Sequence, residues 1–393
     1  MNLRPSLSLL FAVPLSLALT ACGGGGGGSG ESTDNGNGNG SSVCVAGTTT
    51  VQWDKLLTEN AAKLSDYQLF ANPCDATDNP SPRGVPYTLS TPLFTDYASK
   101  YRFVFVPDDT TATYSADAAF SFPVGTVITK TFSLPSDTSE RGFEHETQIE
   151  TRLLIHRATG WVALPYVWNA DHTDAALDLN GEQISTELTH KETTYALDYG
   201  VPDPQKCKRC HQSDGIFTPI GPKARFLNSE YDYGSGPENQ LQHWLAAGIL
   251  SGVPADAASI DEVPVFTDNT DISAIPPSQL QTYAKGWMDI NCGHCHRPGG
   301  DASNTNFHAY WELDFDTNHN AHGVCQKPIS YGGGTLSWII YPGNADESIM
   351  IQRMSATEGG DRMPPLGRDL VHGEGVELVK AWINSLADNP ACH

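Results

Sequence analysis

The sequence predicts a multidomain α+β protein in which an N-terminal antiparallel β-rich module precedes two mainly α-helical domains. Between about residues 87 and 195, apolar and polar side chains tend to alternate, which is the pattern of half-buried strands. After Gly200 the apolar residues recur at helical spacing. The pattern Cys-x-x-Cys-His occurs once in each expected helical domain, at 207–211 and 292–296. The expected boundaries are 44–196 for the β-rich module, 197–270 for the first helical domain and 271–393 for the second.

The N-terminal segment 1–21 has the features of a lipoprotein signal peptide. A basic residue precedes an apolar run at 9–19 that is too short to span a membrane as a helix, and small residues follow. The ending Leu-Thr-Ala-Cys at 19–22 resembles the bacterial lipobox, which implies a lipid on Cys22. Since Gly23 follows in place of Asp, we expect an outer-membrane lipoprotein on the periplasmic side or at the cell surface. The alternative is an ordinary export signal.

The tether before the β-rich module and the elements of the module itself follow from composition and spacing. Residues 22–43 are rich in Gly, Ser and Asn and predict a flexible tether. Loosely periodic apolar residues at 53–70 predict a short helix, and prolines and glycines then mark turns. The expected strands are 101–106, 127–132, 150–156 and 161–168.

Three helices are expected in the second half of the chain. The first covers 238–250 and ends before Gly252. The second starts at Ser278 as N-cap and runs into the second Cys-x-x-Cys-His motif. The third covers 375–386.

The repeated motif carries the functional prediction. Cys-x-x-Cys-His is the attachment pattern of c-type haem, because two intervening residues place both sulfurs along one edge of the macrocycle and the next residue supplies an imidazole to the iron. We therefore predict two covalently bound haem c groups and two mainly α cytochrome c-type domains. The predicted attachment residues and iron ligands are Cys207, Cys210 and His211 for the first haem, and Cys292, Cys295 and His296 for the second.

Two other uses of paired cysteines fit the spacing less well. A compact zinc site expects its Cys-x-x-Cys pairs roughly 15–20 residues apart. The pairs in this chain are separated by about four times that distance, and each has its own trailing His. A thioredoxin-like redox motif requires a βαβ context, which neither motif has.

Four cysteines remain after haem attachment and lipidation are counted. They are Cys44, Cys74, Cys325 and Cys392. Export places them in an oxidising compartment, and four cysteines allow three pairings. Proximity along the chain and the domain division favour Cys44–Cys74 and Cys325–Cys392, each worth roughly 2–4 kcal/mol.

The sixth iron ligand of the second haem is expected to be Met363. It lies between His296 and the last helix, and Pro364 and Pro365 stiffen the backbone after it. A His–Met haem is saturated and passes electrons. Met350 and Met354, four residues apart, are expected to pack in the core.

The sixth ligand of the first haem stays open at this point. No Met occurs between His211 and Met288. Met288 and His243 are equal candidates, and an open position or a residue of the β-rich module is the other alternative. His294, inside the second motif, is expected to face solvent.

Several segments resemble a family of bacterial two-haem c-type cytochromes with an N-terminal β-rich module, whose members mostly have no defined function. The resemblance covers about residues 50–390 and implies an exported electron-transfer role without supplying a substrate. The matching segments are 64–67, 92–100, 123–126, 150–154, 166–169, 291–300 and 363–365.

The charge limits the partners. The formal net charge of −23 argues against binding to nucleic acid or to acidic lipid surfaces, so any membrane contact depends on the N-terminal lipid. We expect redox proteins as partners. A basic cluster could neutralise the haem propionates, dock an acidic partner or be a solvated surface. Its members are Lys206, Lys208, Arg209, Lys223 and Arg225.

The predicted function is therefore electron transfer between periplasmic or cell-surface proteins, with no catalytic residue. The alternative is a diheme peroxidase-type oxidoreductase with an open first haem. A third interpretation makes the β-rich module a binding device, in which His156, Trp161, Tyr166 and Trp168 line a ligand site.

Overall fold

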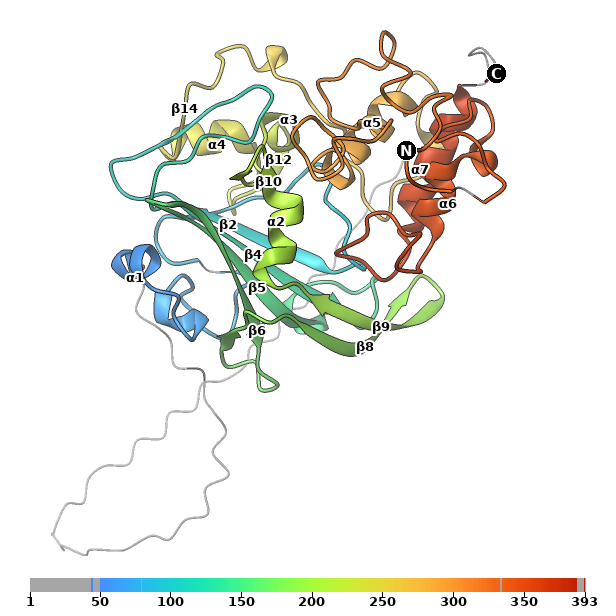
Figure 1. Ribbon diagram of the computed structural model, residues 1–393. Coiled ribbons are helices and arrows are strands. Elements are labelled where there is room, and N and C mark those ends of the chain that lie inside the picture. Colours follow the sequence, from blue (N-terminus) through green and yellow to red (C-terminus); the bar gives the residue numbers. More distant parts are fainter. Residues whose placement is uncertain (1–43, 45–49, 79, 333, 387–391, 393) are drawn as a thin grey trace, which may run out of the picture. The chain divides into compact units, whose positions relative to one another are not determined.

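Strands between residues 84 and 177 form an antiparallel sheet with the strand order β1-β2-β4-β5-β6-β7 (Figure 1). The computed structural model describes residues 44, 50–78, 80–332, 334–386 and 392, and these belong to one compact unit. The predicted signal peptide, the tether and Cys22 lie outside the described residues. The six strands are β1 Gly84–Pro86, β2 Ser99–Phe105, β4 Val127–Pro135, β5 Glu146–Arg157, β6 Gly160–Trp168 and β7 Ala175–Leu177.

Both faces of this sheet are covered, because successive side chains on a strand point to opposite faces. On one face, Phe103 and Leu153 pack in a core with Leu56 and Tyr67 from the N-terminal segment. The other face contributes to a different core, in which sheet residues pack with apolar residues from the second half of the chain. This second core holds Val104 and Ile128 together with Phe226, Leu241 and Trp244.

The other strands are short, apart from one hairpin. In that hairpin β8, Glu182–His190, pairs with β9, Thr193–Val201. β3, Ala112–Thr113, pairs in parallel with β14, Leu250–Ser251. The remaining pairs are β10 Gln212–Ser213 with β11 Ile216–Phe217, and β12 Glu230–Asp232 with β13 Pro237–Asn239.

The helices of the described residues are mostly short as well. α5, α6 and α7 share a core with Trp287, Met288, Leu378 and Trp382, and α2 lies against the sheet beside β6 (Figure 1). The 3-10 turns are Leu64–Tyr67, Phe143–His145, Ala257–Ser259, Ile272–Ala274 and Ala345–Glu347. The α-helices are α1 Trp53–Thr58, α2 Pro204–His211, α3 Ala224–Leu227, α4 Gln240–Ala246, α5 Leu280–Asn291, α6 Ile349–Ser355 and α7 Gly373–Ser385. Within the described part of the chain, none of these is long and apolar enough to cross a membrane.

The prediction of two mainly α-helical cytochrome c domains is wrong. The protein is β-rich, and only 21% of it is helical. Between 197 and 270 the helices have eight, four and seven residues, and turns at Gly215, Gly234 and Gly236 adopt positive φ and form short hairpins instead. The apolar residues of this segment share one core with residues of the sheet, so their spacing also reflects burial against strands.

Two disulfides join the pairs that the sequence favoured. Cys44 is bonded to Cys74 and Cys325 is bonded to Cys392. The second bridge closes a segment of 67 residues that contains α6 and α7.

Candidate functional site

The first Cys-x-x-Cys-His motif forms the last turns of α2. The helix begins there because the Asp203 carboxylate accepts hydrogen bonds from the backbone N–H groups of Gln205 and Lys206, and Pro204 occupies the first turn. Residues three apart lie on one face of a helix. Cys207 and Cys210 therefore share a face, and both line one cavity with His211. We call it the first cavity.

The second motif follows directly on α5. Cys292 caps the helix, and its carbonyl accepts the backbone N–H groups of Cys295 and His296. The tight turn requires Gly293, because a Cβ there would lie 2.7 Å from the Asp289 carbonyl oxygen. Cys292, Cys295 and His296 line a cavity that we call the second cavity.

The two motif histidines are oriented by the same kind of hydrogen bond, from Nδ1 to a backbone carbonyl. Nδ1 of His211 lies 2.9 Å from the Thr218 carbonyl oxygen, and Nδ1 of His296 lies 3.2 Å from that of Phe307. Since a carbonyl can only accept, each Nδ1 donates and Nε2 keeps the lone pair that binds a metal. Burial lowers the pKa of both rings to about 4, which keeps them neutral at pH 7.

The lining of both cavities fits a large apolar group. Ile128, Leu154 and Ile290 line the first cavity, and Phe307 and Ile339 line the second. Such a lining with two thiols and an oriented imidazole is the chemistry that a covalently attached haem requires.

Met363 lies on a loop that lines both cavities. Its N–H donates to the Arg353 carbonyl at 2.9 Å, and its own carbonyl accepts from the Arg368 guanidinium at 2.8 Å. Arg368 is 4% exposed and also donates to the carbonyl oxygens of Ala356 and Leu370. The buried guanidinium therefore holds the backbone on which Met363 sits.

Neither sequence candidate for the sixth ligand of the first haem lines the first cavity. Met288 is buried and lines the second cavity. His243 pairs with Glu238 at 2.9 Å and stacks on Tyr233, away from the residues that line either cavity in the described part of the chain.

Three further residues line the first cavity and offer ligand atoms: Met354, His294 and His372. Met354 lines the second cavity too, besides packing in the core as expected. The expectation that His294 faces solvent is wrong, since it is 8% exposed and bonds the Ile290 carbonyl. His372 was missed, because a single His before a helix carries no pattern.

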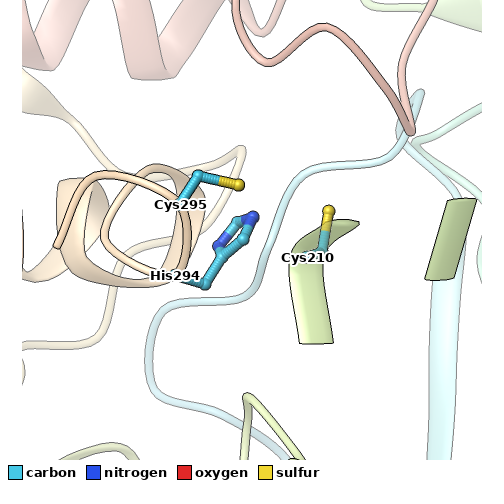
Figure 2. Close-up of side chains that lie close together, drawn as sticks. All are labelled: Cys210, His294 and Cys295. Carbon is cyan, nitrogen blue, oxygen red and sulfur yellow. The ribbon is translucent and has the colours of Figure 1, made fainter. Parts of the chain in front are cut away.

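The two motifs meet. The sulfurs of Cys210 and Cys295 and a ring nitrogen of His294 all lie within 4.8 Å of one another. Figure 2 shows Cys210 on one side, with His294 and Cys295 from the segment after α5 on the other. The hydrogen bond from the Cys295 thiol, together with that from His294, lowers the pKa of Cys210, and the same bond raises the pKa of Cys295.

Polar contacts outside the motifs fix this approach. The Arg209 guanidinium pairs with Asp301 at 3.0 Å. The backbone N–H of Asp214 donates to the Gly299 carbonyl at 3.0 Å. These two contacts thus join the segments that carry the two motifs.

The predicted basic cluster is not one patch. Lys223 and Arg225 are buried and pair with the fully buried Asp289 of α5. Arg209 pairs with Asp301 as above, and Lys206 pairs with Asp203 at 3.3 Å. Lys223 and Arg225 therefore share one buried acid, while Lys206 and Arg209 each pair with a different one.

In the β-rich module, the four side chains that were expected to line a ligand site fall into two pairs. Tyr166 and Trp168 are buried in the core on the N-terminal side of the sheet. His156 stacks on Trp161 and hydrogen-bonds the Phe122 carbonyl, and both side chains line a third cavity together with Cys210 and His211.

Comparison with known proteins adds no relative: no family model, no curated protein and no solved structure matches the chain. The functional argument therefore depends on the site itself.

Proposed function

We propose that the protein is an exported two-haem c-type cytochrome that carries electrons between redox proteins. The observation that carries the proposal is the repeated ligand geometry. Each motif presents two thiols beside an apolar cavity, and each motif histidine is fixed through Nδ1 with Nε2 left to bind iron. A haem c at each motif would supply one-electron redox chemistry.

The protein's own residues would set the conditions for this electron transfer. The apolar walls exclude water, which is one of the means by which a protein sets a haem potential. Met363 offers a thioether on the loop held by Arg368. Because the Cys210 and Cys295 sulfurs lie within 4.8 Å, groups attached to them would be close neighbours, as transfer between the two requires.

The cluster of Cys210, Cys295 and His294 raises a second possibility, a bound metal ion other than haem iron. Two thiolates and one imidazole, from Cys210, Cys295 and His294, suit zinc. A zinc ion there would use one thiol of each motif and leave Cys207, Cys292 and both oriented histidines without a role. The cavities beside those residues favour haem over zinc.

Peroxidase activity is the second candidate function. Met363 lines both cavities but can bind one iron at a time, and neither Met288 nor His243 lines the first cavity. An iron at the first motif with a free sixth position could bind peroxide. Turnover of peroxide with a reduced cytochrome would favour this function over electron transfer.

Haem content tests the proposal. The protein is produced in a bacterium that matures c-type cytochromes, and its haem is counted after denaturation by absorbance in alkaline pyridine. We expect two haems per chain that stay bound to the denatured polypeptide. Cys207→Ser/Cys210→Ser and Cys292→Ser/Cys295→Ser should each leave one. A haem-free protein that contains one zinc would contradict the proposal.

Export and anchoring are proposed from the sequence, through cleavage before Cys22 and lipidation of that residue. Membrane fractionation checks this. The wild-type chain should sediment with membranes and Cys22→Ser should not.

A further inference from the structure

Three cations lie side by side across the middle of the large sheet. Arg102 of β2 is opposite Lys130 of β4, and Lys130 is opposite Arg152 of β5. Residues in such a row share one face of the sheet. Like charges directly opposite one another on neighbouring strands are destabilising. This arrangement, which we call the basic row, therefore calls for a counter-charge.

The protein supplies only part of that counter-charge. Glu150 binds Arg152, with 2.8 Å between Oε2 and Nε. Arg102 is 6% exposed and donates to the Lys100 carbonyl. Among the described residues, no carboxylate forms an ion pair with Arg102 or Lys130, and the charge of Glu150 acts on Lys130 only beyond ion-pair distance. Charged side chains are seldom buried without a partner.

The pKa of Lys130 reflects this excess of positive charge. Burial, together with the charges of Arg152 and Arg102, lowers the pKa of Lys130 to about 7. The ammonium group lies 4.9 Å from the centre of the Phe132 ring, which the Arg152 guanidinium also covers at 4.2 Å. An aromatic face attracts a cation but carries no charge to neutralise it.

The next row of the same sheet face is apolar. It consists of Val104, Ile128, Leu154 and Ala163, which lie opposite one another on four neighbouring strands. The last three of these line the first cavity, and so do all three members of the basic row. One wall of the first cavity is thus apolar along one strip and cationic along the next.

The first motif faces this wall. Cys207 and His211 line the same cavity. Lys130 of the basic row and both motif residues thus line one cavity. A group attached at Cys207 and Cys210 would therefore lie against both strips of the sheet.

We infer that the basic row binds the carboxylate groups of the haem held at the first motif, while the apolar strip contacts its ring. This inference rests on the proposed function. Haem is an apolar macrocycle with two propionate carboxylates, and Arg102 and Lys130 are two cations without an acidic partner. The sheet is then the wall of a cofactor site. The basic row is also distinct from the basic cluster predicted from the sequence between Lys206 and Arg225. Most members of that cluster pair with acidic residues.

The test compares Lys130→Met, Lys130→Arg and a control, Lys63→Met. Lys63 is 65% exposed and belongs to the segment that covers the opposite face of the sheet. For each purified holoprotein we measure haem per chain and the two midpoint potentials by spectroelectrochemistry. Cys207→Ser/Cys210→Ser identifies the potential that belongs to the first haem.

Loss of a cation beside the haem favours the more positively charged oxidised state, so its potential falls. We expect Lys130→Met to raise the oxidised-to-reduced ratio of the first haem about tenfold at fixed ambient potential, which is 59 mV for one electron. The second haem should not change. In Lys130→Arg and Lys63→Met, the oxidised-to-reduced ratio of each haem should stay within a factor of two of the wild-type ratio.

Each result decides. A normally loaded Lys130→Met protein with an unshifted first haem overturns the inference and leaves the proposed function standing. No haem in the wild-type protein overturns both. If Lys130→Met and a second neutral variant, Lys130→Gln, lack the first haem while Lys130→Arg is fully loaded, the charge is required and the inference holds. If Lys130→Arg also lacks it, the position needs the lysine shape and the inference is wrong.

Discussion

Replacement of Asp289 by Asn should be among the most destabilising single changes near the site. Asp289 lies on α5, three residues before Cys292, and is fully buried. Its carboxylate is 3.3 Å from the Lys223 ammonium and 2.9 Å from the Arg225 guanidinium, and it accepts the N–H of Trp311 at 3.1 Å. The pair of cations comes from the segment that follows the first motif. Asp289 therefore links the surroundings of both motifs.

The expected loss in the free energy of unfolding follows from the contacts that each of the two cations keeps after the substitution. Removing one member of a buried ion pair costs about 3–5 kcal/mol, because the other charge stays buried without compensation. Arg225 retains Glu312 at 2.7 Å and the Asp117 carbonyl. Lys223 is 4% exposed and loses its acidic partner. We therefore expect about 3 kcal/mol, at the lower end of that range.

Urea denaturation at pH 7, followed by circular dichroism, measures this loss. The matched control is Asp346→Asn, because Asp346 is 78% exposed and its pair with Lys380 is a surface one. A surface pair contributes about 0–1 kcal/mol. A loss below about 1 kcal/mol for Asp289→Asn would refute the reasoning, since it would mean that the buried pair contributes no more than the exposed one.

The same group gives a pH dependence. Burial alone would raise the pKa of Asp289, but Lys223 and Arg225 outweigh it and hold the pKa below its usual value. The stabilisation is thus complete above the unfolded carboxyl pKa of about 4 and is lost as the pH falls through the lower folded value. The Asp289→Asn protein should lack this acid-dependent loss, and unfolding curves between pH 5 and pH 2 check it.

Three further changes have defined outcomes. Burial raises the pKa of Asp96 to about 6, so stability should fall as the pH rises from about 4 to about 6, and Asp96→Asn should abolish that fall in urea titrations at several pH values. Arg368→Met should loosen the Met363 loop, which we expect to weaken the absorption band of methionine-bound ferric haem while leaving haem content unchanged; an unaltered band would contradict the positioning role. Cys325→Ser should cost about 2–4 kcal/mol in urea by opening the bridge to Cys392, and an unchanged midpoint would show that the bridge is dispensable.

Local patterns in the sequence predicted local structure well. The strand expected at 127–132 lies within β4, the strand expected at 101–106 overlaps β2 as far as Phe105, and the helix expected at 375–386 corresponds to α7. The two thiols and the imidazole of each motif line one cavity, while their predicted attachment to haem stays a prediction. These features depend on residues a few positions apart, where the period of a strand or helix is decisive.

Features that depend on distant residues were not predictable. The contact between Cys210 and Cys295 joins parts of the chain that no pattern relates. The basic row depends on strand register, which turn lengths and the irregularity between Phe132 and Ser133 set. The prediction of a mainly helical domain at 197–270 is wrong because burial of apolar residues against a sheet gives a similar spacing over short stretches.

Electron paramagnetic resonance of the oxidised holoprotein, followed through a reductive titration, tests the central claim most directly. If the protein is an electron carrier, side chains fill the sixth position at both irons. We then expect two low-spin ferric signals that disappear on reduction, with no high-spin signal at any stage. A high-spin signal that grows on partial reduction would contradict the account and point to a first haem that opens to substrate.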